Sequence, residues 1–380
     1  MTSGWISADR LFDGSILRSN YAVQIKSDRI IALSPTADLE KEDIIQHHVG
    51  LLTPGFFDIQ VNGGGGALLN SDPSVGVIDT IAKAHRSKGT VAFLPTVITD
   101  KTSVLEAAAD ALLQAKDVPG VMGLHIEGPH LSKARRGTHD ASYIRPLDAK
   151  TFSLVRELRD ADATVLITVA PESATQNKIA QLSEMGAVVS IGHTDASAAD
   201  AANAVAAGAT CFTHLFNAMS PMQNRAPGVT GAAIASDVWC SIIADGIHVD
   251  PMMVTLAIRA RPKPDRMILV SDAMATVGGP DAFMLYGQEI HLDDGRLVNA
   301  EGSLAGAHLT MLDALRNLVS YGVDLQAALR MCRQNPAQLL GIWDKLGLMG
   351  MDAADLVVLD DDLSLKQVGV AFTPKASKQA

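Results

Sequence analysis

Cysteine is scarce in this sequence, with only Cys211, Cys240 and Cys332, which stand far apart and never in a Cys-x-x-Cys spacing. This excludes a disulfide framework and a cysteine-rich zinc site, and it favours a reducing, cytoplasmic compartment. Long apolar runs are also missing, and the N-terminus lacks a basic segment followed by an apolar stretch. We therefore expect neither a transmembrane helix nor a signal peptide, but a soluble protein.

The sequence also has fewer basic than acidic residues. Lys and Arg number 31 against 42 Asp and Glu, which gives a formal net charge of -11. Because nucleic-acid binding depends on Lys and Arg that neutralise phosphates, this balance argues against a nucleic-acid partner. It does not argue against a small anionic substrate, since a few local cations can hold one phosphate. Aromatic residues make up only 4% of the 380 residues, so small aliphatic side chains must fill the core.

The two ends of the chain share a β-rich character. Short strand-like segments broken by turns fill the first fifty residues, and residues 355–360 have the pattern of a buried strand. We expect one small β-sandwich domain formed by both termini, residues 1–52 and 349–380. The remaining residues, 53–348, form the main domain.

In the middle of the chain, apolar strand-like segments alternate with helix-like segments, a pattern typical of a parallel sheet covered on both faces. Eight such strands over about 250 residues predict a (β/α)8 TIM-like barrel of the metal-dependent hydrolase type. The alternative is an open doubly wound sheet, although no GxGxxG follows the first strand. The expected strands are 55–61, 91–98, 121–126, 164–169, 187–191, 210–215, 240–247 and 267–270, and helices are expected at 75–88, 103–114, 174–185 and 196–207.

Ionisable residues stand where the expected strands end, which is where barrel enzymes place their chemistry. Glu127, His193 and His214 end the third, fifth and sixth strands. Carboxylate and imidazole suit Zn²⁺ or Fe²⁺, and three protein ligands leave a position for water, whose pKa a bound metal lowers towards about 7. Asp272 ends the last strand, where a carboxylate can accept a proton from that water and later protonate a leaving group.

Each of these residues also has a structural interpretation: a hydrogen-bonded histidine, or an aspartate that caps the next segment. The joint pattern favours a metal site, because buried charges are costly unless they are paired or ligated.

Eight short motifs run through nearly the whole chain in a fixed order. They are residues 54–63 (PGFFDIQVNG), 125–129 (HIEGP), 137–139 (GTH), 192–194 (GHT), 213–219 (THLFNAM), 245–248 (DGIH), 270–274 (VSDAM) and 304–306 (LAG). Each is short, but together they resemble the amidohydrolase superfamily and, within it, the family of N-acetylglucosamine-6-phosphate deacetylases. The resemblance implies hydrolysis of N-acetyl-D-glucosamine 6-phosphate to D-glucosamine 6-phosphate and acetate.

The resemblance also implies a role for each matched position. Glu127, His193 and His214 would bind the metal, Asp272 would act as general base and acid, and His139 would contact the acetyl carbonyl and stabilise the oxyanion.

For the substrate, the resemblance implies backbone contacts from Asn217 and Ala218, and phosphate contacts from His248 and Arg225. Arg225 would reach into the site of the neighbouring subunit, so a homodimer is implied.

Gln60 and Asn62 depart from the superfamily pattern, because most members carry His-x-His at these positions and neutral amides are poor Zn²⁺ ligands. The fourth strand, residues 164–169, also lacks a lysine that could be carboxylated to bridge two metals. We therefore expect one divalent metal per subunit, Zn²⁺ with Fe²⁺ as the alternative. His130 receives no role, and we expect it to lie in a loop and face solvent.

Three other functions stay open. N-acetylgalactosamine 6-phosphate differs from the expected substrate at one hydroxyl, which the sequence cannot distinguish. A cyclic-amide hydrolase would carry the His-x-His pair and the bridging lysine that are missing here. A non-catalytic sugar-phosphate sensor would have lost Asp272 or a metal ligand, whereas all of them are present.

Overall fold

The computed structural model describes residues 3–299, 302 and 304–370. Residues 1–2 and 371–380 of the expected β domain lie outside the described residues. Within the described part of the chain, no helix is both long enough and apolar enough to cross a membrane.

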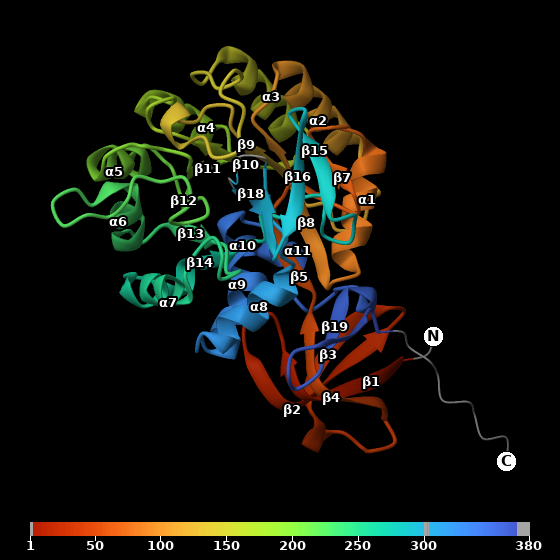
Figure 1. Cartoon of the computed structure of the whole chain (residues 1–380). Helices are drawn as coiled ribbons and strands as arrows, with labels where there is room; N and C mark the ends of the chain where they lie inside the picture. The colour runs from red at the N-terminus through yellow and green to blue at the C-terminus, as the bar shows by residue number, and fades with distance from the viewer. Residues whose placement is uncertain (1–2, 300–301, 303, 371–380) are drawn as a thin grey trace.

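Eight parallel strands lie next to one another in chain order and form the centre of the molecule (Figure 1). A parallel bridge between Val61 and Ala273 joins the first strand to the segment after the last strand. Sequential order with closure confirms the predicted barrel, since a doubly wound sheet reverses its strand order. The strands are β5 (Phe56–Val61), β8 (Thr90–Ile98), β9 (Gly123–Glu127), β10 (Thr164–Val169), β11 (Val188–Ile191), β12 (Cys211–Phe212), β13 (Trp239–Ile242) and β14 (Met267–Leu269).

A helix follows each barrel strand and covers its outer face. Side chains fix several helix starts: Ser74 caps α1, Asp148 caps α3, and Ser197 forms a capping box with Asp200 in α5. Helices α1, α2, α4 and α5 correspond to the four expected ranges. The helices are α1 (Val75–Arg86), α2 (Thr102–Gln114), α3 (Ala149–Asp160), α4 (Gln176–Glu184), α5 (Ala198–Ala206), α6 (Gly228–Ala235), α7 (Pro251–Ala260), α8 (Met311–Ser320), α9 (Leu325–Cys332), α10 (Gln334–Leu339) and α11 (Trp343–Leu346).

Two barrel strands are shorter than expected. β12 ends at Phe212 and β13 at Ile242, whereas the apolar pattern predicted strands to residues 215 and 247. Beyond these strand ends the backbone turns: His214 has a φ of 35° and Gly246 a φ of 73°, which are not extended conformations. The polar residues beyond these strands therefore lie in loops at the barrel mouth.

The predicted small β domain from both termini is confirmed. Its sheet has the order β20-β19-β4-β1-β2-β3, so the C-terminal strands extend the N-terminal ones. A core of its own includes Ile6, Val23 and Val358, all at most 1% exposed. The strands are β1 (Ser3–Phe12), β2 (Leu17–Lys26), β3 (Arg29–Pro35), β4 (Ile44–Pro54), β19 (Leu356–Leu359) and β20 (Leu365–Val368).

Sequence reasoning missed a four-stranded antiparallel insert between β14 and α8 (Figure 1). Its apolar residues Leu285, Ile290 and Leu297 pack against Ile98 and Met274 at the barrel mouth. The insert therefore forms one wall of the region where the barrel strands end. Its strands are β15 (Ala282–Leu285), β16 (Gln288–Asp293), β17 (Arg296–Val298) and β18 (Leu304–Ala307). Separately, two short antiparallel strands, β6 (Gly63–Gly64) and β7 (Ala67–Leu68), follow β5 in the chain.

Candidate active site

A cavity of about 170 Å³ lies at the C-terminal ends of the barrel strands. Its position matches the mouth where barrel enzymes carry their chemistry. All predicted site residues except Arg225 line it. The lining residues are Asn62, Ile98, Glu127, Gly137, Thr138, His139, His193, His214, Asn217, Ala218, Ile243, His248, Asp272, Met274, Leu304 and Gly306.

Three predicted metal ligands meet in this cavity. His214 Nε2 lies 2.9 Å from Glu127 Oε1 and 3.1 Å from His193 Nε2, and His193 Nε2 lies 3.3 Å from the same carboxylate oxygen. Ligand atoms about 2.0–2.1 Å from a tetrahedral ion lie about 3.3 Å apart, so these distances fit one ion. All three side chains are buried, which suits a site that keeps one position open to the cavity.

A partner behind one of the two imidazoles, that of His193, orients it for ligation. His193 Nδ1 donates to the backbone oxygen of Arg135 at 2.9 Å, so its Nε2 presents a lone pair. His214 Nδ1 is buried and has no hydrogen-bond partner in the described part of the chain. Burial alone would raise the pKa of Glu127, but the adjacent imidazoles of His193 and His214 hold that pKa well below its usual value. The donor set therefore offers an ionised carboxylate and two imidazole nitrogens.

His139 lies close enough to belong to a second ligand set, because ligand atoms of Glu127, His139 and His193 all lie within 4.8 Å of one another. Its Nδ1 is already engaged by Thr99, with the hydroxyl at 2.7 Å and the backbone N–H at 3.4 Å. Burial, reinforced by the charge of His193, lowers the pKa of His139 to about 3. A neutral His139 that accepts at Nδ1 carries its proton on Nε2 and suits hydrogen-bond donation better than ligation.

Two amides hold Asp272. Asn62 Nδ2 donates to its Oδ1 at 2.7 Å, and Gln60 Nε2 donates to the same atom at 3.2 Å. Gln60 Nε2 also lies 3.0 Å from Glu127 Oε1. Burial, together with the charge of Glu127, raises the pKa of Asp272 to about 6. A fixed carboxylate with a pKa near neutrality can act as a general base and acid.

The backbone is strained at three of these residues. His193, His214 and Asp272 have φ values of 46°, 35° and 51°, in the left-handed region that non-glycine residues rarely adopt. Such strain persists only where surrounding contacts impose it, and it clusters at functional sites. Beneath Asp272, the buried Asp58 accepts hydrogen bonds from the backbone N–H and hydroxyl of Ser271, which fixes the seam between β5 and β14.

Further lining residues form a polar side of the cavity. His248 Nδ1 donates to Asp245 Oδ2 at 2.6 Å, and Asp245 Oδ1 also accepts the backbone N–H groups of Ile247 and His248. This arrangement leaves His248 Nε2 for a ligand. Asn217 and Ala218 follow His214 in the same loop, and Ala218 has a φ of 50°. The structure thus brings the predicted substrate-binding residues together, apart from one.

Arg225 is the exception. It lies in an exposed loop before α6 and does not line the cavity of its own chain.

The expectation that His130 faces solvent is wrong, because its side chain is fully buried. Its ring bonds the backbone oxygen of Arg145 at 3.0 Å and the Thr151 hydroxyl at 2.8 Å. His130 therefore ties the loop after β9 to α3.

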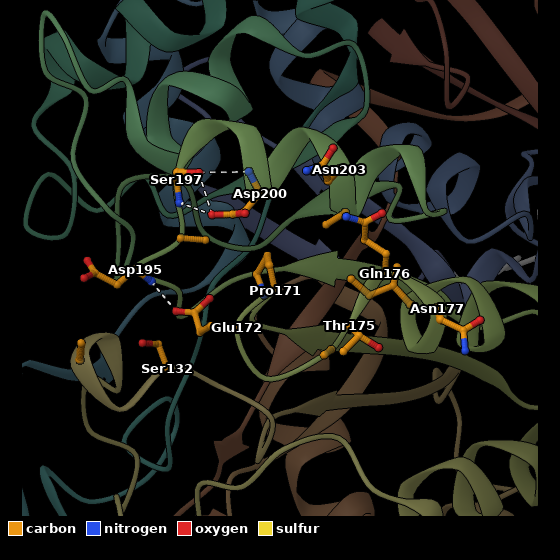
Figure 2. A pocket seen from close by; sticks show the side chains of 15 residues that line it. Ser132, Pro171, Glu172, Thr175, Gln176, Asn177, Asp195, Ser197, Asp200 and Asn203 are labelled. Atoms are coloured by element: carbon orange, nitrogen blue, oxygen red, sulfur yellow. Dashed lines mark hydrogen bonds between the residues drawn. The ribbon is translucent and has the colours of Figure 1, made fainter.

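A larger hollow of about 810 Å³ lies between the starts of α4 and α5, and Figure 2 shows its lining. None of the predicted site residues lines it. Its polar groups bond one another: Glu172 accepts the backbone N–H of Asp195 at 2.8 Å, and Ser197 bonds Asp200 at 2.7 Å (Figure 2). We therefore place the chemistry in the smaller cavity, where ionisable groups converge.

Comparison with known proteins agrees with this geometry. Residues 51–378 match the model of the amidohydrolase family. The chain belongs to the amidohydrolase family. This confirms the predicted superfamily and shows that the chain is a hydrolytic enzyme of a metal-dependent class. Glu127, His139 and His193 form a group of side chains that could hold a metal ion.

Relatives and solved structures resemble the chain over most of its length. An N-acetylgalactosamine-6-phosphate deacetylase of Shewanella sp. (strain ANA-3) is 38% identical over 93% of this chain and 91% of its own. An N-acetylglucosamine-6-phosphate deacetylase of Haemophilus influenzae is 35% identical over 86% of this chain and 87% of its own. The crystal structure of N-acetylglucosamine-6-phosphate deacetylase from Pasteurella multocida is 32% identical, covers 96% of this chain and 97% of its own, and has a TM-score of 0.88.

Sequence reasoning missed the partners of the predicted residues. Thr99 holds His139, and Gln60 and Asn62, interpreted only as lost metal ligands, hold Asp272. The spacing of Asp245 and His248, three residues apart after a strand, is a signal that would have revealed their hydrogen bond. The sequence holds no comparable signal for Thr99, which is 40 residues from His139.

Proposed function

We propose that this chain hydrolyses the acetamide of N-acetyl-D-glucosamine 6-phosphate to D-glucosamine 6-phosphate and acetate. The observation that carries the proposal is the convergence of Glu127, His193 and His214 beside Asp272 in one cavity. The names of relatives in Haemophilus influenzae and Pasteurella multocida support the substrate.

Glu127, His193 and His214 would hold one ion, for which we propose Zn²⁺ with Fe²⁺ as the alternative. When bound, the ion supplies a Lewis acid that polarises the amide carbonyl and lowers the pKa of water.

The remaining steps belong to the protein's own side chains. Asp272 accepts a proton from the attacking water while the new bond to the carbonyl carbon forms. His139 donates a hydrogen bond from Nε2 to the carbonyl oxygen as negative charge develops there. Asp272 then delivers the proton to the nitrogen, so that the C–N bond breaks and the product leaves as an amine rather than an anion. Acetate is the other product.

The sugar phosphate would lie along the polar side, with His248 and the backbone of Asn217 and Ala218. We propose that Arg225 contacts the phosphate in the site of a second subunit, because it is exposed and outside its own cavity. Exposed apolar side chains near α6 and on α7 support a homodimer through this face: Met222 is 49% exposed and Met252 74%. Such a dimer would complete each site with one arginine.

We also propose a cytoplasmic location. Cys211, Cys240 and Cys332 are buried free thiols, and free thiols are typical of reducing compartments. Cell fractionation with an antibody against the protein tests this location.

N-acetyl-D-galactosamine 6-phosphate is the second candidate substrate, because the Shewanella relative carries that name at 38% identity. The two sugars differ in the configuration of one hydroxyl. Measuring kcat/KM on both epimers side by side decides between them. A higher value on the galactosamine epimer would replace our first choice.

Metal removal tests the proposal as a whole. Chelation should abolish acetate release, and reconstitution with single metals should restore it at one ion per subunit. Elemental analysis of each sample should follow the activity. Full activity in a sample free of divalent ions would contradict the proposal.

A further inference from the structure

Three apolar side chains, which we call the apolar wall, line the same cavity: Ile98, Met274 and Leu304. Ile98 and Met274 are 4% and 1% exposed. Both of these residues adjoin the reacting groups. Ile98 precedes Thr99, whose hydroxyl bonds His139, and Met274 lies two residues after Asp272.

The side chains of Ile98 and Met274 are packed against other residues on the side away from the cavity. Ile98 and Met274 belong to one packed cluster with Leu68 and with Leu285 of the insert. The backbone of β18 also presses on Met274, because a Cβ placed on Gly306 would lie 2.6 Å from Met274 Cγ. A larger acyl group could therefore be accommodated only if Ile98 or Met274 displaced packed neighbours.

We propose that Ile98, Met274 and Leu304 form an acyl subsite that fits a two-carbon acyl group and excludes longer N-acyl chains. This inference rests on the proposed deacetylation. An amide held between Asp272 and His139 directs its polar sugar phosphate towards His248 and leaves its acyl group for the apolar wall. The wall residues are therefore determinants of chain length and not of the sugar.

N-acetyl, N-propanoyl and N-butanoyl forms of the sugar 6-phosphate test the subsite. One extra methylene in a fitted apolar pocket lowers kcat/KM by about 10- to 200-fold, and we expect this loss for the native enzyme. Met274→Ala and Ile98→Ala should each raise the propanoyl-to-acetyl ratio by about tenfold or more. Ile243→Ala is the matched control, since Ile243 lines the same cavity but packs in a different cluster from Ile98 and Met274, and it should not shift this ratio.

The outcomes separate the subsite from the proposed function. If the native protein does not hydrolyse the N-acetyl form of either epimer, the function itself is wrong. If it does, an unchanged ratio in the folded Met274→Ala and Ile98→Ala variants overturns the subsite, as does an equal shift in Ile243→Ala. Thermal melting establishes folding. If an alanine variant does not fold, Ile98→Val, which removes one methyl group, replaces it. A smaller rise in the propanoyl-to-acetyl ratio then supports the subsite, and an unchanged ratio overturns it.

Discussion

Replacing Asn62 with leucine tests how Asp272 is held. Asn62 is 4% exposed, and its Nδ2 donates to Asp272 Oδ1 at 2.7 Å. A hydrogen bond to a charged group contributes about 1.5–3 kcal/mol. If the bond orients the carboxylate in the transition state, its loss should lower kcat by about ten- to 150-fold, at 1.36 kcal/mol per tenfold change. Leucine has nearly the shape of asparagine, so packing should change little.

Steady-state acetate release against pH is the assay. The hydrogen bond from Asn62 lowers the pKa of Asp272, so its removal should raise that pKa above about 6. Because Asp272 must be ionised to accept a proton, the acid limb of kcat should move to higher pH. Asn335→Leu is the control, since Asn335 is equally buried and bonds Met267 at the far end of β14. The same loss of kcat in both variants, or an unmoved acid limb in Asn62→Leu, would refute the reasoning.

Three further changes have defined outcomes. Asp272→Asn should keep its metal by elemental analysis yet lose nearly all turnover; substantial activity would remove its catalytic role. Arg225→Ala should raise KM for the phosphorylated sugar with kcat nearly unchanged, and an unchanged KM would exclude Arg225 from the site. Burial lowers the pKa of His85 to about 4. The unfolded chain then binds more protons between pH 6.5 and 4, so stability falls as pH falls through this window, by up to about 1.4 kcal/mol per pH unit. In urea unfolding, the free energy of unfolding of His85→Gln should fall less steeply with falling pH than that of the native chain, by up to about 1.4 kcal/mol per pH unit. An equal slope in the two proteins would contradict this prediction.

The barrel was predictable because its signal is local. Every barrel strand is a run of apolar residues bounded by polar ones, and the carboxyl ends of parallel strands share one edge. Glu127, His193 and His214 could therefore be assigned to one mouth from sequence alone. The strand lengths were less predictable, since Leu215 suggested that the strand continued beyond Phe212, while the backbone turns at His214.

Contacts over long sequence separations could not be predicted. Asn62 and Asp272 are 210 residues apart, and only the closure of β5 against the segment after β14 brings them within 2.7 Å. The insert of β15 to β18 escaped notice for another reason. Most residues of its strands are exposed or half-buried, so the apolar signal that marks a strand is weak there.

The placement of Gln60 supports the proposal of a single metal ion. Its Nε2 donates to Glu127 Oε1 at 3.0 Å and to Asp272 Oδ1 at 3.2 Å, so N–H groups point at both carboxylates. A cation between those carboxylates would face these donors rather than lone pairs, and would have to displace them. The amide thus fills with hydrogen-bond donors the side of the site that a second ion would occupy. It leaves the face of Glu127 towards His193 and His214 for the one ion that the distances fit.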